Sequence, residues 1–174
     1  MLEWLPEKVC VNPWTAETYN VLYGIFCRDI RDADIYYRGY SVWIFREIDD
    51  GREKIFWHLT TREVKPTPIP RRKRRFYPKD QTHIKGDRYP DFRRCERLPW
   101  VKPLIESPGE SEIVDWDYEE GDQTIRTYVW LKEHDFVVIM KKYPDNKRRL
   151  ITSFYVDQSY KRKDFEKNYE QRIK

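Results

Sequence analysis

The sequence predicts an α+β domain in which a four-stranded antiparallel sheet and an additional hairpin pack against N-terminal, middle and C-terminal helices. Four β-rich segments follow one another in the C-terminal third, and helical periodicity of apolar residues occurs before and after them. The 174 residues fit a single domain and are enough to bury a hydrophobic core. Aromatic residues make up 16% of the chain, which argues against intrinsic disorder.

Residues 1–64 are expected to hold a helix and a hairpin. Within residues 15–30, one helical face carries an apolar and aromatic set, namely Tyr19, Leu22, Tyr23 and Phe26. Residues 39–62 consist of two β-rich arms around Asp50-Gly51, a dipeptide typical of primed hairpin turns. The segment KIFWHLTTR, residues 54–62, is therefore predicted to be the second strand of this hairpin.

The middle of the chain is rich in proline and in cations. Residues 65–90 contain five scattered prolines, which predicts a long extended loop without regular structure: Pro66, Pro68, Pro70, Pro78 and Pro90. Helical periodicity resumes in residues 91–107, where Phe92, Cys95 and Leu98 are spaced for one face. Pro99 and Pro103 are expected to break or bend this helix.

Residues 91–174 are expected to continue into a four-stranded meander and a closing helix. The predicted strands are residues 112–120, 123–132, 134–143 and 148–157, and turn residues join them. The third strand is apolar on both faces from Phe136 to Met140, which predicts a central strand covered on both sides. A final helix is predicted over residues 159–173, with aromatic residues at approximately helical spacing.

Positive charge is concentrated in one part of the chain. The net charge is +4, yet residues 65–97 carry twelve Lys and Arg against four Asp and Glu. Such a patch is typical of a protein that binds a polyphosphate, although a solvated basic loop is the alternative. The densest run is expected to contact nucleic-acid backbone through Arg71, Arg72, Lys73, Arg74 and Arg75.

Cysteine usage and hydropathy indicate the compartment. The three cysteines, Cys10, Cys27 and Cys95, are odd in number and widely spaced, which favours a reduced, cytoplasmic protein. No window approaches 18 uncharged apolar residues, so no membrane partner is expected. No nucleotide-binding glycine loop and no cofactor motif are found. The carboxylates of residues 113–122 are interpreted as a solvated acidic edge rather than a metal site, and no metal is predicted.

Four blocks of the sequence, spread over residues 54–169, resemble a known family in their order and character. The blocks are FWHLTTRE, DFRRCERLPWVKPLIE, YVWLKEHDFVVIM and RRLITSFYVD. They resemble a phage- and prophage-associated group within the barnase, EndoU, colicin-type and RelE-type nuclease superfamily. The resemblance implies a small metal-independent endoribonuclease, often a toxin, whose antiparallel sheet presents catalytic residues on one face. RNA is then the expected partner, together with a protein antitoxin or inhibitor.

His58 is the candidate acid or base. Metal-independent RNA cleavage needs a group that takes a proton from the 2′-hydroxyl, a group that returns one to the leaving oxygen, and cations that stabilise the phosphorane. Histidine suits proton transfer because its pKa lies near neutrality. In a strand, alternation would place His58 and Arg62 on one face. The alternative is a histidine satisfied by hydrogen bonds at the edge of the aromatic core, and His83 and His134 are expected to be exposed or structural.

Arginines of the predicted middle helix are candidates for phosphate binding. Arg93 and Arg97 are four residues apart, so both guanidinium groups can project from one helical face and grip a phosphate. Arg94 and Lys102 are expected to add nucleic-acid contacts. Glu96 supports the alternative of a salt-bridged surface. Trp100 is expected to anchor this helix in the core rather than to stack on a base.

The family resemblance assigns two further residues to the site. In LITSFYVD, Thr152 and Tyr155 correspond to the Thr and Tyr of the family's LxTAYxVD-type strand, where a hydroxyl could bind phosphate or orient the attacking group. Ser153 stands where the family has Ala. Alternation puts Thr152 and Tyr155 on opposite faces, so they share a site only if a bulge intervenes.

Two functions from different classes therefore follow. The first is a metal-independent endoribonuclease, a toxin or phage-encoded effector, in which His58 transfers protons. Arg62 and the Arg93/Arg97 pair would hold the scissile phosphate. The second is a nucleic-acid-binding or phage accessory protein without catalysis, which uses the basic residues 71–75 for backbone contacts and Tyr77 for stacking.

Overall fold

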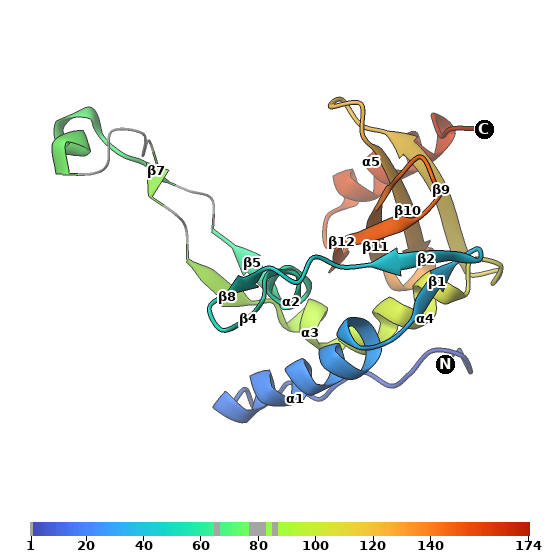
Figure 1. The fold of residues 1–174 in the computed structure, drawn as a ribbon, viewed down its shortest axis with the longest axis horizontal. Helices are drawn as coiled ribbons and strands as arrows, with labels where there is room; N and C mark the ends of the chain where they lie inside the picture. Colours follow the sequence, from blue (N-terminus) through green and yellow to red (C-terminus); the bar gives the residue numbers. More distant parts are fainter. Residues whose placement is uncertain (1, 65–66, 77–82, 85–86) are drawn as a thin grey trace.

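The computed structural model describes residues 2–64, 67–76, 83–84 and 87–174. Six strands of the described residues form one sheet in the order β1-β2-β12-β11-β10-β9 (Figure 1). Their bounds are β1 (Ile35–Tyr37), β2 (Tyr40–Trp43), β9 (Ile113–Glu119), β10 (Ile125–Leu131), β11 (Phe136–Lys142) and β12 (Arg148–Tyr155). Neighbouring strands are antiparallel except β2 and β12, which are parallel. The class is α+β, but the predicted antiparallel four-stranded sheet is wrong, because the sheet is larger and mixed.

The predicted hairpin over residues 39–62 is the origin of this difference. Its first arm is β2, which leaves the expected partner and pairs with Arg148 and Arg149 of β12. Around Asp50 and Gly51, both with positive φ, only a minimal ladder forms, between β3 (Ile48–Asp49) and β4 (Arg52–Glu53). The pairing of β2 with a strand about a hundred residues later leaves no local trace in the sequence.

The second arm of the predicted hairpin is a helix, α2 (Lys54–Thr60). Its residues Ile55, Phe56 and Leu59 are buried at helical spacing. Glu53, the residue before the helix, is also buried and accepts a hydrogen bond from Tyr23 Oη at 2.8 Å. A short apolar run fits a strand and a helix almost equally well. Packing against the rest of the molecule, rather than local pattern, selects the helix, and the predicted strand face of His58 and Arg62 is wrong.

The described residues between 61 and 90, namely 61–64, 67–76, 83–84 and 87–90, form an arm that extends away from the sheet in Figure 1. Its base is a ladder between β5 (Thr61–Glu63) and β8 (Arg88–Pro90), and further out β6 (Thr67–Pro68) pairs with β7 (His83–Ile84). A 3-10 helix, Arg71–Phe76, lies at its far end. The prediction of a loop without regular structure is therefore wrong for the described part of this segment. Pro68 and Pro90 are tolerated because a two-stranded ladder leaves one edge of each strand unpaired.

Apart from α2 and the 3-10 helix of the arm, the helical segments of the described residues lie in four parts of the chain. The first is α1 (Ala16–Phe26), which continues as a π-helical turn over Cys27–Arg31. The predicted middle helix is divided into α3 (Phe92–Glu96), a 3-10 turn Leu98–Trp100 and α4 (Val101–Glu106). Pro99 stands where the regular helix is interrupted, as expected from its missing N–H group. A 3-10 turn, Lys132–His134, joins β10 to β11, and α5 (Ser159–Glu170) follows β12.

Two hydrophobic cores cover the two faces of the sheet. Phe136, Val138 and Met140 of β11 belong to the larger core, which also contains buried residues of the first four helices. Val137 and Ile139 belong to the smaller core beneath α5. The prediction that this strand is covered on both faces is thus confirmed. Among the described residues, none of the helices has the length and apolar composition that crossing a bilayer requires.

Candidate active site

A cleft of about 610 Å³ lies between α2, the base of the arm and strand β12. Strand β2 pairs with only the first two residues of β12, so the remaining edge of β12 is left to α2 and α3. The charged side chains that line the cleft are five cations and two carboxylates, namely Lys54, Arg62, Arg88, Arg94, Arg149, Glu47 and Glu63. His58, Thr152, Phe45 and Phe154 line it as well.

His58 lines the cleft because helix α2 turns its apolar residues Phe56 and Leu59 towards the core and leaves the histidine on another face. The backbone carbonyl of His58 accepts a hydrogen bond from Arg94 Nη1 at 2.8 Å and another from Thr152 Oγ1 at 3.3 Å. These contacts hold the end of α2 against α3 and β12. The imidazole is half-buried and lines the cleft. The helix therefore presents the histidine to the cleft.

The surroundings of His58 favour its neutral form. Burial lowers the pKa of the imidazole below its ordinary value of 6.5, and the positive charges of Arg88 and Lys54 lower it further. Glu63 opposes this shift in part. A neutral imidazole can accept a proton at neutral pH, which is the property that a general base needs.

Asp91 fixes two of the guanidinium groups. Its carboxylate lies 3.1 Å from Arg62 Nη2 and 3.2 Å from Arg94 Nε, and it caps the N-terminus of α3. Asp157 lies 3.3 Å from the same Nη2 atom of Arg62. Because two carboxylates restrict the Arg62 side chain, its charge is held at the lining of the cleft rather than free in solvent.

The remaining charges leave the cleft positive. Glu63 lies 3.7 Å from Arg88, and Glu47 lies 3.5 Å from Lys54. The two carboxylates thus neutralise part of the five cations. Asp91 and Asp157 pair with Arg62 and Arg94 as well, so one positive charge remains in excess when these partners are counted. Such a surface attracts a phosphodiester and releases the counterions bound to it.

Only part of the predicted catalytic set lies in this cleft. His58, Arg62, Thr152 and the predicted nucleic-acid-binding residue Arg94 are brought together there. Arg93, Arg97 and Tyr155 form a separate cluster, in which the guanidinium carbons lie 4.4 and 4.8 Å from the tyrosine ring centre. Arg97 is buried there and pairs with Glu96, which agrees with the alternative that Glu96 forms a salt bridge with a neighbouring arginine. The predicted phosphate clamp of Arg93 and Arg97 therefore does not line the cleft.

The separation follows from the register of β12. A bulge places Ile151 between the residues that pair with Met140 and Ile139. This bulge precedes Thr152, so alternation still sends Thr152 and Tyr155 to opposite faces. Thr152 and Tyr155 could share one site only if a bulge lay between them, and the bulge lies before both.

Other predicted residues lie away from the cleft lining. The Lys102 ammonium on α4 donates to the carbonyl of Asp34 at 3.1 Å and to Glu106 at 2.7 Å, so it fastens α4 rather than facing the cleft. Trp100 is buried, as predicted, and His134 packs edge-on against its ring. The residues Arg71, Arg72, Lys73, Arg74 and Arg75 are exposed at the far end of the arm. Tyr77 and the His83 side chain lie outside the described part.

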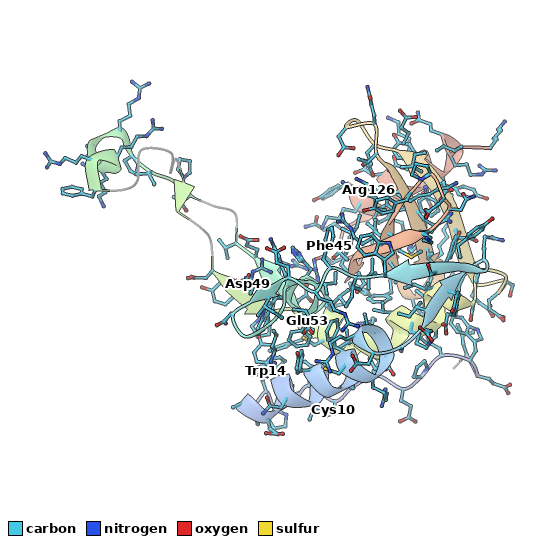
Figure 2. All side chains as sticks on the ribbon, viewed as in Figure 1. Cys10, Trp14, Phe45, Asp49, Glu53 and Arg126 are labelled. Carbon is cyan, nitrogen blue, oxygen red and sulfur yellow. The ribbon has the colours of Figure 1, made fainter. Side chains whose placement is uncertain are left out.

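Several cleft residues were not predicted from the sequence. Lys54 and His58 are spaced four apart, so a helical assignment of KIFWHLT would have put them on one face. Arg149 stands three residues before Thr152 in the strand that the family resemblance had already marked. Arg88 and Phe45 gave no comparable signal, because they reach the cleft from the arm and from the segment after β2. Figure 2 shows Phe45 on that segment.

Comparisons with protein-family models, curated proteins and solved structures yield no match for this chain.

Proposed function

We propose that this protein is a metal-independent endoribonuclease that cuts RNA in the basic cleft between α2, the arm and β12. One observation carries the proposal: a half-buried imidazole with a lowered pKa lines the same cleft as five cations. A purely electrostatic binding surface needs the cations but has no need for a half-buried neutral histidine beside them. The resemblance to the phage-associated nuclease group supports the same chemistry.

The cleft residues suit cleavage by the RNA's own 2′-hydroxyl. In the proposed reaction, His58 takes the proton of this hydroxyl, and the resulting oxyanion attacks the adjacent phosphorus. Arg62, Arg88 and Arg94 stabilise the negative charge that accumulates on the phosphorane. The bond to the 5′-oxygen then breaks, and this oxygen takes a proton from solvent. The products are a 2′,3′-cyclic phosphate and a free 5′-hydroxyl.

Thr152 has a positioning role in this scheme. Its hydroxyl donates to the His58 carbonyl rather than to the imidazole, so it fixes the backbone that carries the base. Arg94 of α3 donates to the same carbonyl, and its positive charge also lines the cleft. Loss of the Thr152 hydroxyl should therefore lower cleavage less than loss of the His58 imidazole.

The test is RNA cleavage in EDTA by the wild-type protein and by His58→Ala and His58→Gln. Removal of a general base typically lowers the rate by about 10²–10⁴-fold, and both variants should show such a loss while retaining affinity for RNA. His134→Ala is the matched control, because His134 packs against Trp100 and does not line the cleft. Cleavage that persists undiminished in folded His58→Ala protein would overturn the proposal.

A second candidate function is nucleic-acid binding without catalysis. It is favoured by the exposed run Arg71–Arg75, which lies at the far end of the arm and does not line the cleft. In that case, the wild-type protein would bind RNA or DNA of the same sequence equally and leave both intact. Binding would also survive substitution of His58 and decrease when the arm loses its cations.

A further inference from the structure

We infer that three aromatic side chains beside the cleft form a base-stacking subsite, and that the substrate is therefore single-stranded RNA. The three residues, called the aromatic platform here, are Trp43, Phe45 and Tyr143. This inference rests on the proposed endoribonuclease function, because it names the form of RNA that reaches the cleft. The platform itself is a binding site for unpaired nucleotides whether or not cleavage occurs.

The platform brings together rings from two distant segments. Trp43 ends β2 and Phe45 follows two residues later, with ring centres 5.1 Å apart in an edge-on arrangement. Tyr143 comes from the turn between β11 and β12, and its ring centre lies 5.6 Å from that of Trp43. Phe45 is 52% exposed and Trp43 is 36% exposed. Aromatic faces of this size are costly to leave in water and are used in proteins to stack on bases.

Cations are interleaved with the rings. The Arg149 guanidinium carbon lies 4.1 Å from the Phe45 ring centre and 5.8 Å from that of Trp43. Lys141 Nζ lies 5.6 Å from the Tyr143 ring centre. Alternating rings and cations provide stacking for bases and neutralisation for the phosphates that connect them. An apolar protein partner would have no use for this charge.

The platform is continuous with the cleft. Phe45 and Arg149 line the cleft, and Arg149 also pairs in register with Trp43 of the neighbouring strand. Beyond Trp43, a second hollow of about 410 Å³ is lined by Trp43, Tyr143, Pro144, Asp145 and Lys147. A chain of nucleotides that occupies the cleft can therefore continue over Phe45 and Trp43 towards Tyr143. Bases in a duplex are already stacked and paired, so only unpaired nucleotides can use these rings.

The first experiment measures binding of a 2′-O-methyl single-stranded RNA of about 12 nucleotides, a length within the range that single-strand binders cover. This probe has no 2′-hydroxyl and is not cut by the proposed chemistry. Phe45→Ala and Trp43→Ala should each weaken binding on the order of tenfold, whereas Phe45→Tyr should preserve it. Phe92→Ala is the matched control, because Phe92 is also 52% exposed but does not line the cleft. Unchanged affinity in both alanine variants overturns the inference.

A second experiment identifies stacking as the cause. Probes with one abasic nucleotide are compared on the wild-type protein and on Phe45→Ala. At the position that stacks on Phe45, the abasic probe should bind the wild-type protein more weakly than the intact probe does, by about the same factor as the Phe45→Ala substitution costs. The Phe45→Ala variant should bind the abasic and the intact probe equally, because the stacking contact is already lost. Additive losses at every position would contradict stacking. Self-association of the wild-type protein that Phe45→Ala abolishes would instead assign the platform to a second copy of the chain.

These outcomes separate the subsite from the nuclease activity. If the platform variants lose binding and the wild-type protein does not cleave RNA, the stacking subsite is supported and the endoribonuclease function is contradicted. If binding is unchanged and cleavage depends on His58, the endoribonuclease function is supported and the subsite is contradicted. A duplex RNA that competes as well as the single strand would also overturn the subsite, because its bases cannot reach the rings.

Discussion

His58 is the residue on which the proposed chemistry depends, and its environment predicts the pH dependence. Burial and the nearby charges of Arg88 and Lys54 keep the pKa of the imidazole below 6.5. A general base works only when it is unprotonated, so kcat/KM should rise with pH through this lowered pKa and level off above it. The acid limb of a kcat/KM profile should therefore have its midpoint below pH 6.5.

Arg88→Gln offers a direct check of that assignment. Removal of this positive charge should raise the pKa of His58 towards its ordinary value and shift the acid limb to higher pH. The maximal rate is expected to fall as well, because Arg88 also lines the cleft in which the scissile phosphate is proposed to bind. Glu63→Gln should move the limb in the opposite direction, since Glu63 favours the protonated imidazole. An acid limb that stays fixed in both variants would show that another group titrates.

Asp91 is predicted to hold the site together. Asp91→Asn keeps a good N-cap for α3 but removes the charge that pairs with Arg62 and with partly buried Arg94. The free energy of unfolding should fall by about 1–3 kcal/mol, because a buried charged donor loses its partner. Asp157→Asn is the control, since it touches exposed Arg62 and should cost less than about 1 kcal/mol. Urea denaturation measures both, and equal losses in the two variants would contradict this account.

At the scale of elements, α2 carries the histidine and depends on tertiary packing for its form. Phe56 is fully buried against Tyr23 and Phe26 of α1, with ring centres 5.3 and 5.5 Å away. Phe56→Ala should destabilise the protein by about 3–5 kcal/mol, because apolar burial is reduced and a cavity is left behind. Phe92→Ala, at an exposed phenylalanine, should cost less than about 1 kcal/mol. Thermal unfolding that is equally affected by the two changes would contradict the assigned packing.

The arm is predicted to contribute affinity without contributing to the fold. Replacement of the cations of Arg71–Arg75 with glutamine should leave the free energy of unfolding unchanged, because these side chains are exposed. RNA affinity should decrease, and the slope of log affinity against log salt should become shallower by about 0.7 for each phosphate that the variant no longer neutralises. An unchanged slope would mean that the arm does not touch nucleic acid.

Local patterns predicted some elements and missed others for identifiable reasons. The strands β9 to β12 are rich in β-branched and aromatic residues and are joined by turns a few residues long, so their positions could be predicted. Helix α2 could not be predicted, because an apolar run as short as KIFWHLT is compatible with a strand as well as with a helix. The arm was missed because its ladders join residues fifteen or more positions apart, and the scattered prolines argued against strands.

At the scale of the whole molecule, the cleft is assembled from three separate parts of the chain. Residues 45–63 supply His58 and Arg62, residues 88–94 supply two arginines, and residues 149–154 supply Arg149 and Thr152. The chemistry of RNA cleavage had marked His58, Arg62 and Arg94 as candidates, and the family resemblance had marked Thr152; all four line the cleft. Neither argument could separate them from Arg93, Arg97 and Tyr155, since that distinction depends on how β12 faces α3.

A cellular prediction follows if the protein is a toxin. Expression of the wild-type chain in bacteria should slow growth and degrade RNA, because an unspecific or broadly targeted ribonuclease depletes transcripts. His58→Ala should relieve this effect at equal protein levels, and Phe92→Ala should not. Equal toxicity of the wild-type protein and His58→Ala would contradict the proposed role.

The most direct measurement is an analysis of the products that wild-type protein makes from single-stranded RNA in EDTA. The account predicts fragments with 2′,3′-cyclic phosphate and 5′-hydroxyl ends, seen by mass spectrometry, while DNA of the same sequence stays intact. Intact RNA, or fragments with 3′-hydroxyl and 5′-phosphate ends, would contradict it, because the latter ends require water rather than the 2′-hydroxyl as nucleophile.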